Sequence, residues 1–366
     1  MQLVYLSPVA WASFAQRPHK FVQWFHDQGG GEVLWIDPYP TRLPSWKDFG
    51  RKRGELSDTG ASQPSWLQVV QPKALPIEPL PGSGLINRWL WDEVLRQAVT
   101  FLAQKPCVLG IGKPSELGIQ LLARVPQTFS FYDAMDDFPF FYHGLSHRVM
   151  VRREREIVSR VSKVLVSSSA LFRRLSNYHR EIVMALNACA VETLPAYTGV
   201  GPQSEDCVIG YVGTIGKWFD WELVFSLARR NPAKHVRLIG PVYSPPSGRI
   251  PDNIEMLPAC DHATAIIAMG KFAVGLIPFK RTPLTASVDP IKYYEYRALG
   301  LPVLTTCFGE MALRSHEPGV IVVDERTDLV AAIAKALAYQ PNRDEIQQFR
   351  TENSWEARFA ATGILS

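Results

Sequence analysis

The chain has 366 residues, 46% of them hydrophobic and 20% charged, which is typical of a globular protein and suits two domains of about 150 to 200 residues each. No apolar run approaches the roughly 20 residues that a membrane-spanning helix needs, which excludes an integral membrane protein. The net charge of +4 is too small for a typical nucleic-acid-binding protein, although residues 1–200 hold 22 Lys and Arg against 17 Asp and Glu.

Strand and helix patterns alternate through the first half of the chain. The opening "MQLVYLSPVAWASFA" lacks a basic leader and is broken by Pro8, so we interpret it as a buried strand and a loop rather than a signal peptide. Short apolar runs predict strands, and apolar residues at helical spacing predict helices between several of them. The strands are expected at 2–7, 31–37, 106–112, 127–134 and 163–169, and the helices at 19–28, 86–104 and 148–161.

The same alternation restarts after a turn-rich segment at 194–207, and we place a domain boundary near residues 199–205. Strands are expected there at 208–213, 235–241, 253–257, 272–279, 302–306 and 319–324. The pattern predicts an α/β protein of two doubly wound, Rossmann-like domains. Ligands of such sheets bind beyond the carboxyl ends of the strands, so the two domains are expected to face a cleft. The predicted segments are an acceptor-binding domain at 1–200, a donor-binding domain at 207–345, and a C-terminal helix at 346–366 that packs back toward the first domain.

Cysteine usage and charge bear on the compartment and on partners. The five cysteines are widely spaced and include no CxxC motif, which indicates a reducing cytoplasm and neither disulfides nor a zinc site. The segment 147–156, "HRVMVRRERE", has interleaved charges typical of a solvated helix face. Its arginines could also meet anionic lipid headgroups, which would place the protein at the inner face of the plasma membrane.

The stretch "VDPIKYYEYRALGLPVLTT" carries the strongest binding signal. Asp289 suits a helix N-cap, Pro290 the first helical position and Gly300 the left-handed stop. Lys292 then lies in the first turn, where a cation beside the positive helix end is unfavourable by about 0.3 to 1 kcal/mol. We therefore expect a diphosphate to dock there, with Glu295 one turn further on accepting hydrogen bonds from ribose hydroxyls. The alternative is an ordinary ion pair on the helix surface.

A second candidate loop is "YVGTIGKWFDWEL", where Gly213 and Gly216 follow a strand and Lys217 adds a positive charge. Backbone amides of such a loop could face an anion, although a glycine after a strand is commonly just a turn. The run "LGIGKPSE" fits neither a Walker motif nor a dinucleotide-binding fingerprint, because Pro114 follows Lys113.

These runs, with "VRLIGPV" and "GLIPFKRTPLTAS", resemble the donor-binding domain of bacterial GT-B glycosyltransferases, in particular surface-polysaccharide enzymes of the teichuronic-acid and xanthan glucuronosyltransferase types. The runs "QRPHKFVQWF" and "FYDAMDDFPFF" extend the resemblance over most of the chain. It implies a nucleotide-sugar donor and no cofactor, with phosphate at Lys292 and ribose at Glu295. It also implies donor contacts at Gly213, Thr214, Ile215, Phe279, Met256 and Leu257, to which Lys217 is added by its charge.

Three carboxylates after the strand at 127–134 are candidates for the general base. An inverting transfer needs one carboxylate to accept the proton of the acceptor hydroxyl, and no metal if the helix end and Lys292 stabilise the leaving diphosphate. The xanthan-type pattern places the base at Asp136, and Asp133 is the second candidate. Crowding with Asp137 would raise a pKa. Ser287 stands where many retaining relatives carry a glutamate, which favours inversion.

Other roles stay open for several of these residues. An aspartate after a strand is often a turn residue, and Asp136 and Asp137 with His143 and His147 could alternatively hold a metal, although no metal site is predicted. The acceptor side is expected to include Trp11, Arg17, His19 and Asp137, with helix-start packing as the alternative for His19.

The predicted function is transfer of a sugar from a nucleoside-diphosphate sugar to a growing, lipid-linked surface glycan, and a UDP-sugar is the donor we expect first. The alternatives are a non-catalytic partner of glycan assembly at the membrane, and an epimerase or phosphorylase of the same fold.

Overall fold

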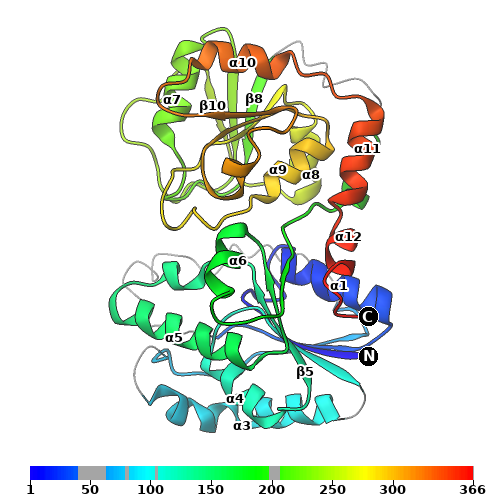
Figure 1. Cartoon of the computed structure of the whole chain (residues 1–366). Coiled ribbons are helices and arrows are strands. Elements are labelled where there is room, and N and C mark those ends of the chain that lie inside the picture. Colours follow the sequence, from blue (N-terminus) through cyan, green and yellow to red (C-terminus); the bar gives the residue numbers. More distant parts are fainter. Residues whose placement is uncertain (40–62, 79–81, 104–105, 198–206, 366) are drawn as a thin grey trace. The chain divides into compact units, whose positions relative to one another are not determined.

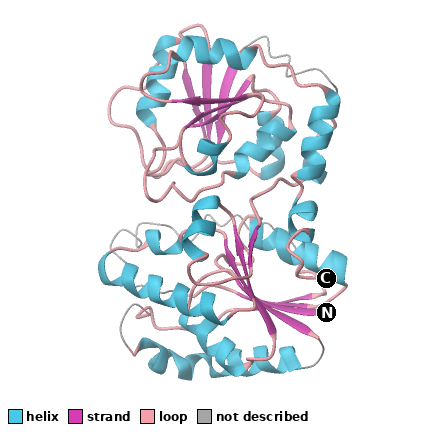
Figure 2. Ribbon diagram, viewed as in Figure 1, coloured by secondary structure: helices cyan, strands magenta, loops and turns pink. Residues whose placement is uncertain are grey.

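The computed structural model describes residues 1–39, 63–78, 82–103, 106–197 and 207–365 (Figure 1). It divides into two compact units, Met1–Ala185 with Phe359–Ser366, and Leu186–Arg358. Each unit holds one parallel sheet with helices on both faces (Figure 2). The predicted architecture of two doubly wound domains is confirmed.

Seven parallel strands form the sheet of the first unit, in the order β3-β2-β1-β4-β5-β6-β7. The winding reverses between β1 and β4, so their carboxyl ends form the topological switch point at which such sheets bind ligands. Strands β3 and β7 were not predicted: both are short edge strands, Gln68 interrupts the apolar run of β3, and the three apolar residues of β7 are only half-buried. The strands are β1 (Gln2–Leu6), β2 (Val33–Ile36), β3 (Leu67–Val70), β4 (Cys107–Ile111), β5 (Phe129–Ala134), β6 (Lys163–Val166) and β7 (Ile182–Met184).

Helices cover both faces of this sheet with different side chains. On one face, Trp91, Leu121 and Ile157 are buried against Val4 and neighbouring strand residues in an aliphatic core. The helices of that face are α3 (Ser83–Ala103), α4 (Glu116–Arg124), α5 (Gly144–Arg160) and α6 (Ser169–Leu175), with the short η1 (Phe138–Phe141) before α5.

The other face has an aromatic core under α1 (Arg17–Gly29). The ring of Phe21 lies 5.8 Å from that of Tyr5 and 5.1 Å from that of Phe359, measured between centroids. Phe359 belongs to α12 (Trp355–Ala360), so the end of the chain completes the first unit.

The second unit has six parallel strands in the order β10-β9-β8-β11-β12-β13, which is the strand order of dinucleotide-binding domains. All six coincide with predicted strands, because a sheet covered on both faces needs nearly continuous apolar runs. The strands are β8 (Val208–Val212), β9 (His235–Ile239), β10 (Ile254–Leu257), β11 (Val274–Ile277), β12 (Val303–Thr306) and β13 (Val320–Val323).

Helices α7 (Trp221–Arg230) and α10 (Leu329–Leu337) cover one face of this sheet, while α8 (His262–Met269) and α9 (Ile291–Ala298) cover the other. Helix α11 (Arg343–Glu352) packs on α9, where Arg350 Nε donates to the Ala298 carbonyl at 2.8 Å. Two short 3-10 helices, η2 (Val191–Thr193) and η3 (Gly309–Leu313), complete the unit.

The division of the chain differs from the predicted one. Residues 199–205, the predicted boundary, lie outside the described residues, and the second unit already begins at Leu186. The Asn187 amide donates to Asp289 Oδ2 at 2.7 Å, which ties this segment to the second unit. Helix α11, predicted within the segment that returns to the first domain, also belongs to the second unit, and only Phe359–Ser366 returns. Among the described helices, none is both long and apolar enough to cross a membrane.

Candidate active site

Helix α9 begins without a side-chain cap. It starts at Ile291 with Pro290 as the N-cap residue, one position later than predicted. Asp289 is not the cap, because its buried carboxylate forms an ion pair with Arg314 at 2.9 Å and accepts a hydrogen bond from the Tyr294 hydroxyl at 2.8 Å. Among the described residues, no side chain caps the first turn of α9; the Tyr293 amide donates to the Pro290 carbonyl at 3.0 Å, and the amides of Ile291 and Lys292 remain available. By contrast, α7, α8, α10 and α11 are capped by Asp220, Asp261, Asp328 and Asn342.

Lys292, Glu295 and His262 meet beside this helix end. Lys292 Nζ lies 2.6 Å from Glu295 Oε2, and His262 Nε2 lies 3.3 Å from Glu295 Oε1. Burial alone would raise the pKa of Glu295, but Lys292 and His262 hold it below its ordinary value, so the carboxylate is ionised. Glu295 is only 5% exposed, unlike a member of an ordinary surface pair. The prediction missed His262, because its contact with Glu295 joins two separate helices.

Gly213 and Gly240 hold the loops after β8 and β9 against each other. Gly213 has φ 151°, Gly240 has φ 141°, and a Cβ on Gly240 would lie 2.1 Å from the Gly213 carbonyl oxygen. The Gly213 amide donates to the Ile239 carbonyl and the Ile215 amide to that of Pro241, both at 2.9 Å. Of the predicted diphosphate loop, only the Thr214 amide has no hydrogen-bond partner among the described residues. Amides of this loop were expected to face an anion, and the Thr214 amide is the one of these three that is available to do so.

The other predicted donor contacts lie at strand ends of the same unit. Phe279 is half-buried after β11, with its ring centroid 5.1 Å from that of Phe308. Met256 and Leu257 end the edge strand β10 and are half-buried, and the Leu257 carbonyl accepts from the Gly240 amide at 3.1 Å. Lys217 is exposed in the turn before α7.

In the first unit, Asp133 is bound by Arg17 within the protein interior. Arg17 Nη2 lies 2.8 Å and Nε 3.2 Å from Asp133 Oδ1, and Nε lies 3.1 Å from Oδ2. Arg17 also donates to the Ala185 carbonyl at 2.7 Å. Both residues are almost fully buried, at 3% and 0% exposure. A carboxylate that already accepts charge-assisted bonds at both oxygens is poorly placed to accept a substrate proton, and a buried Arg17 is poorly placed to contact a sugar.

Asp136 differs from its two acidic neighbours. It follows β5 in a bend, is half-buried, and its carboxylate makes no hydrogen bond or ion pair with any described residue. Burial, aided by the charges of Asp133 and Asp137 and opposed by Arg17, raises its pKa to about 7. Crowding of carboxylates was predicted to raise a pKa, but burial is the larger cause. Such a group can release and accept a proton near neutral pH.

The remaining predicted residues of the first unit have structural contacts. His19 Nδ1 accepts from the Gln16 amide at 3.2 Å, and its Nε2 donates to the Trp11 carbonyl at 3.1 Å. Burial lowers the pKa of His19, so it stays neutral at the start of α1. Asp137 Oδ1 lies 3.3 Å from Arg174 Nη2.

The alternative metal site is not assembled. His147 Nδ1 donates to the Pro139 carbonyl at 2.7 Å, and the described residues contain no group of three or more His, Cys, Asp or Glu that could hold a metal ion.

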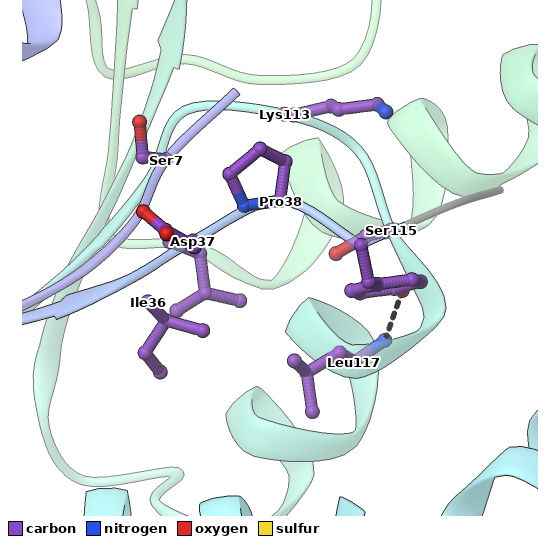
Figure 3. A pocket seen from close by; sticks show the side chains of 9 residues that line it. Ser7, Ile36, Asp37, Pro38, Lys113, Ser115 and Leu117 are labelled. Carbon is purple, nitrogen blue, oxygen red and sulfur yellow. Dashed lines mark hydrogen bonds between the residues drawn. The ribbon is translucent and has the colours of Figure 1, made fainter. Parts of the chain in front are cut away.

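A small cavity lies beyond the ends of β1, β2 and β4, between Ser7, Asp37, Lys113 and Ser115 (Figure 3). Its volume of about 20 Å³ accommodates a water molecule but not a sugar. Beside it the Leu117 amide donates to the Tyr39 hydroxyl at 3.4 Å. None of the candidate residues above lines this cavity.

Comparisons with known proteins give relatives by sequence and by fold. The "Putative teichuronic acid biosynthesis glycosyltransferase TuaH" of Bacillus subtilis (strain 168) is 25% identical over 216 residues, which cover 54% of this chain and 53% of that protein. The chain thus spans about half the length of this curated relative. No protein-family model matches.

Solved structures match over nearly the whole chain. Sucrose-phosphate synthase from Thermosynechococcus elongatus has a TM-score of 0.67 at 14% identity, covering 100% of this chain and 98% of that one. Anabaena HepE in complex with UDP-glucose has a TM-score of 0.63 at 11% identity, covering 99% and 98%. The chain has the GT-B fold. The resemblance to bacterial surface-polysaccharide glycosyltransferases and the fold predicted from the sequence are thereby confirmed.

Proposed function

We propose that the protein is a glycosyltransferase that moves a sugar from a nucleoside-diphosphate sugar, with UDP as the nucleotide, to a surface glycan. The GT-B fold supports a transferase of this type, and the teichuronic acid relative supports a glycan acceptor. The observation that carries the proposal is the uncapped end of α9 beside Lys292, Glu295 and His262.

The donor would bind at this end of α9. A diphosphate accepts hydrogen bonds from the first-turn amides of Ile291 and Lys292 and pairs with the charge of the Lys292 side chain, which leaves Glu295 for a phosphate oxygen. Glu295, still held by His262, then accepts hydrogen bonds from the ribose hydroxyls. Gly213, Thr214, Ile215 and Lys217 border the diphosphate, Phe279 the nucleotide, and Met256 and Leu257 the base. HepE has been solved with UDP and with UDP-glucose, which supports UDP as the first nucleotide to test.

The proposed base is Asp136, with inversion at the anomeric carbon. The acceptor oxygen attacks that carbon, its proton passes to Asp136, and the bond to the diphosphate breaks. The pKa of about 7 supports this role, as does the lack of a protein partner. Asp133 then serves to hold Arg17. No metal is needed if Lys292 and the α9 amides neutralise the leaving diphosphate. We further propose that the acceptor is lipid-linked and met at the cytoplasmic face of the membrane.

Two experiments test this function. Thermal unfolding with UDP, GDP, TDP and UDP-sugars should show the largest rise in melting temperature for UDP compounds, because only the native state binds them. In transfer assays with lipid-linked glycan acceptors, Asp136→Asn should bind UDP as the wild type does yet transfer no sugar, and the product should have the anomeric configuration opposite to the donor. Full activity of this variant would reassign the base, and a retained configuration would exclude inversion. A non-catalytic glycan-assembly partner would consume no donor at all.

A further inference from the structure

The first two turns of α3 present large apolar side chains to solvent. Leu85, Ile86, Trp89 and Leu90 are 71%, 54%, 87% and 42% exposed. The helix is nevertheless firmly seated, because Trp91 on its opposite side is fully buried in the core. These side chains are therefore left largely uncovered by the residues that the structure describes. After Trp91 the helix continues with the charged residues 92, 93 and 96, where the exposed apolar stretch ends.

An arginine-lined groove adjoins these side chains. It has a volume of about 730 Å³ and runs between α3, α4 and α5. Its charged lining consists of four arginines, at 88, 124, 152 and 153, and two glutamates, at 116 and 156, so the arginines are in excess. Figure 1 shows α3 and α4 side by side at the edge of the first unit. Helix α4 contacts α3 and also contacts α5. Arg88 and Arg152 are exposed and have no acidic partner among the described residues. Arg153 is different, since it is buried and pairs with Glu78 and Glu116.

The two units also differ in net charge, and the unit that contains this groove is the positive one. The first unit contains 22 Lys and Arg and 16 Asp and Glu, and the second contains 17 and 19. Exposed Trp and Leu beside unpaired arginines form the combination by which proteins bind the interface of anionic bilayers. The apolar side chains suit the boundary of the acyl chains, and the arginines suit phosphate groups just above it.

We propose that Leu85, Ile86, Trp89 and Leu90, with Arg88, Arg124 and Arg152, form a lipid-docking face that binds the surface of an anionic membrane. The sequence alone pointed instead to the segment 147–156, of which only part contributes, because Arg153 is committed to internal ion pairs. The proposal deepens the proposed function, on which its biological role rests, since a lipid-linked acceptor is presented at the same bilayer.

Sedimentation of the full-length protein with lipid vesicles tests this face. Vesicles of phosphatidylcholine alone and of phosphatidylcholine with 30% phosphatidylglycerol are compared at low salt and at 0.5 M NaCl. The wild type should partition at least tenfold more strongly into the anionic vesicles, and salt should weaken this binding. Trp89→Ser should reduce partitioning about tenfold. Arg88→Glu/Arg152→Glu should reduce it at least about 25-fold, fivefold for each arginine removed.

Matched controls lie in the second unit. Ile267→Ser replaces a 63% exposed apolar residue of α8, and Arg230→Glu reverses an exposed charge at the end of α7. Both should bind vesicles like the wild type. Three results would each overturn the proposal. The wild type could bind neutral and anionic vesicles equally, or variants of the face could bind like these controls. The wild type could also stay in the supernatant, which is the result expected if the face binds a soluble protein partner instead.

The UDP-induced rise in melting temperature, measured on the same proteins, separates this proposal from the proposed function. Variants of the lipid-docking face should keep that rise. Lost vesicle binding with an intact UDP response removes only the docking face, whereas vesicle binding without any UDP response removes only the donor site.

Discussion

Replacing Asp136 by asparagine tests the ionisation of this carboxyl without any substrate. Asparagine has nearly the same shape but cannot lose a proton. The wild-type carboxylate, when ionised, sits half-buried without a described hydrogen-bond partner and close to Asp133 and Asp137. The variant removes that cost, so it should stabilise the protein wherever the wild-type side chain is charged.

The size of the effect follows from the two pKa values. The folded-state pKa is about 7, whereas an unfolded aspartate titrates near about 3.9. Below about pH 4 both states carry the proton, and between about pH 4 and 7 the unfolded state loses it first, so stability is lost as pH rises through this window. About 3 units at about 1.36 kcal/mol each amount to about 4 kcal/mol, of which about 2.7 kcal/mol is lost between pH 5 and pH 8.

Urea unfolding of wild type and Asp136→Asn at pH 5 and pH 8, followed by circular dichroism, measures this difference. The gain of the variant over the wild type in free energy of unfolding should be about 2.7 kcal/mol larger at pH 8 than at pH 5. Asp27→Asn, at an exposed site on α1 of the same unit, is the matched control and should show no such dependence. A gain for Asp136→Asn that is equal at both pH values, or larger at pH 5, would refute the reasoning.

Three further substitutions probe the two units. Asp133→Asn should lower the free energy of unfolding by about 3 to 5 kcal/mol in urea titrations, because it leaves Arg17 charged and buried, and a loss below about 1 kcal/mol would contradict this. Glu295→Gln should weaken UDP binding about tenfold in calorimetry, and equal affinity would argue against a ribose contact. Gly240→Ala should lower the free energy of unfolding by about 1 to 3 kcal/mol. Gly248→Ala, whose added Cβ meets nothing within 4 Å, should lower it less. Equal losses would show that the loops after β8 and β9 can move apart to accommodate the added Cβ.

The sheets could be predicted because burial on both faces requires continuous apolar runs, as in 208–212 and 303–306. The edge strands β3 and β7 escaped prediction, since Gln68 interrupts the apolar run of β3 and β7 has only three residues, all half-buried. The unit boundary also escaped prediction. Turn formers at 194–207 indicate a loop but not which unit it packs on, and the bond from the Asn187 amide to Asp289 decides that.

The candidate site could be predicted where the relevant contact is local in sequence. Lys292 and Glu295 are one helical turn apart, so their spacing alone brings them together. Asp289 was predicted to be the cap because an aspartate commonly precedes a helix. Its carboxylate instead forms an ion pair with Arg314, which is distant in the sequence. His262 likewise reaches Glu295 from another helix. Such partners are set by tertiary packing, which no local pattern encodes.

Titration of UDP into the wild type and into Lys292→Ala by isothermal calorimetry tests the central claim most directly. The claim is that the uncapped end of α9 with Lys292 binds the diphosphate of the donor. The wild type should bind UDP, and the variant should bind it at least about 1.5 kcal/mol more weakly, more than tenfold in Kd. Lys335→Ala, at an exposed site on α10, should bind like the wild type. Equal affinity of Lys292→Ala and wild type, or no UDP binding by the wild type, would contradict the account.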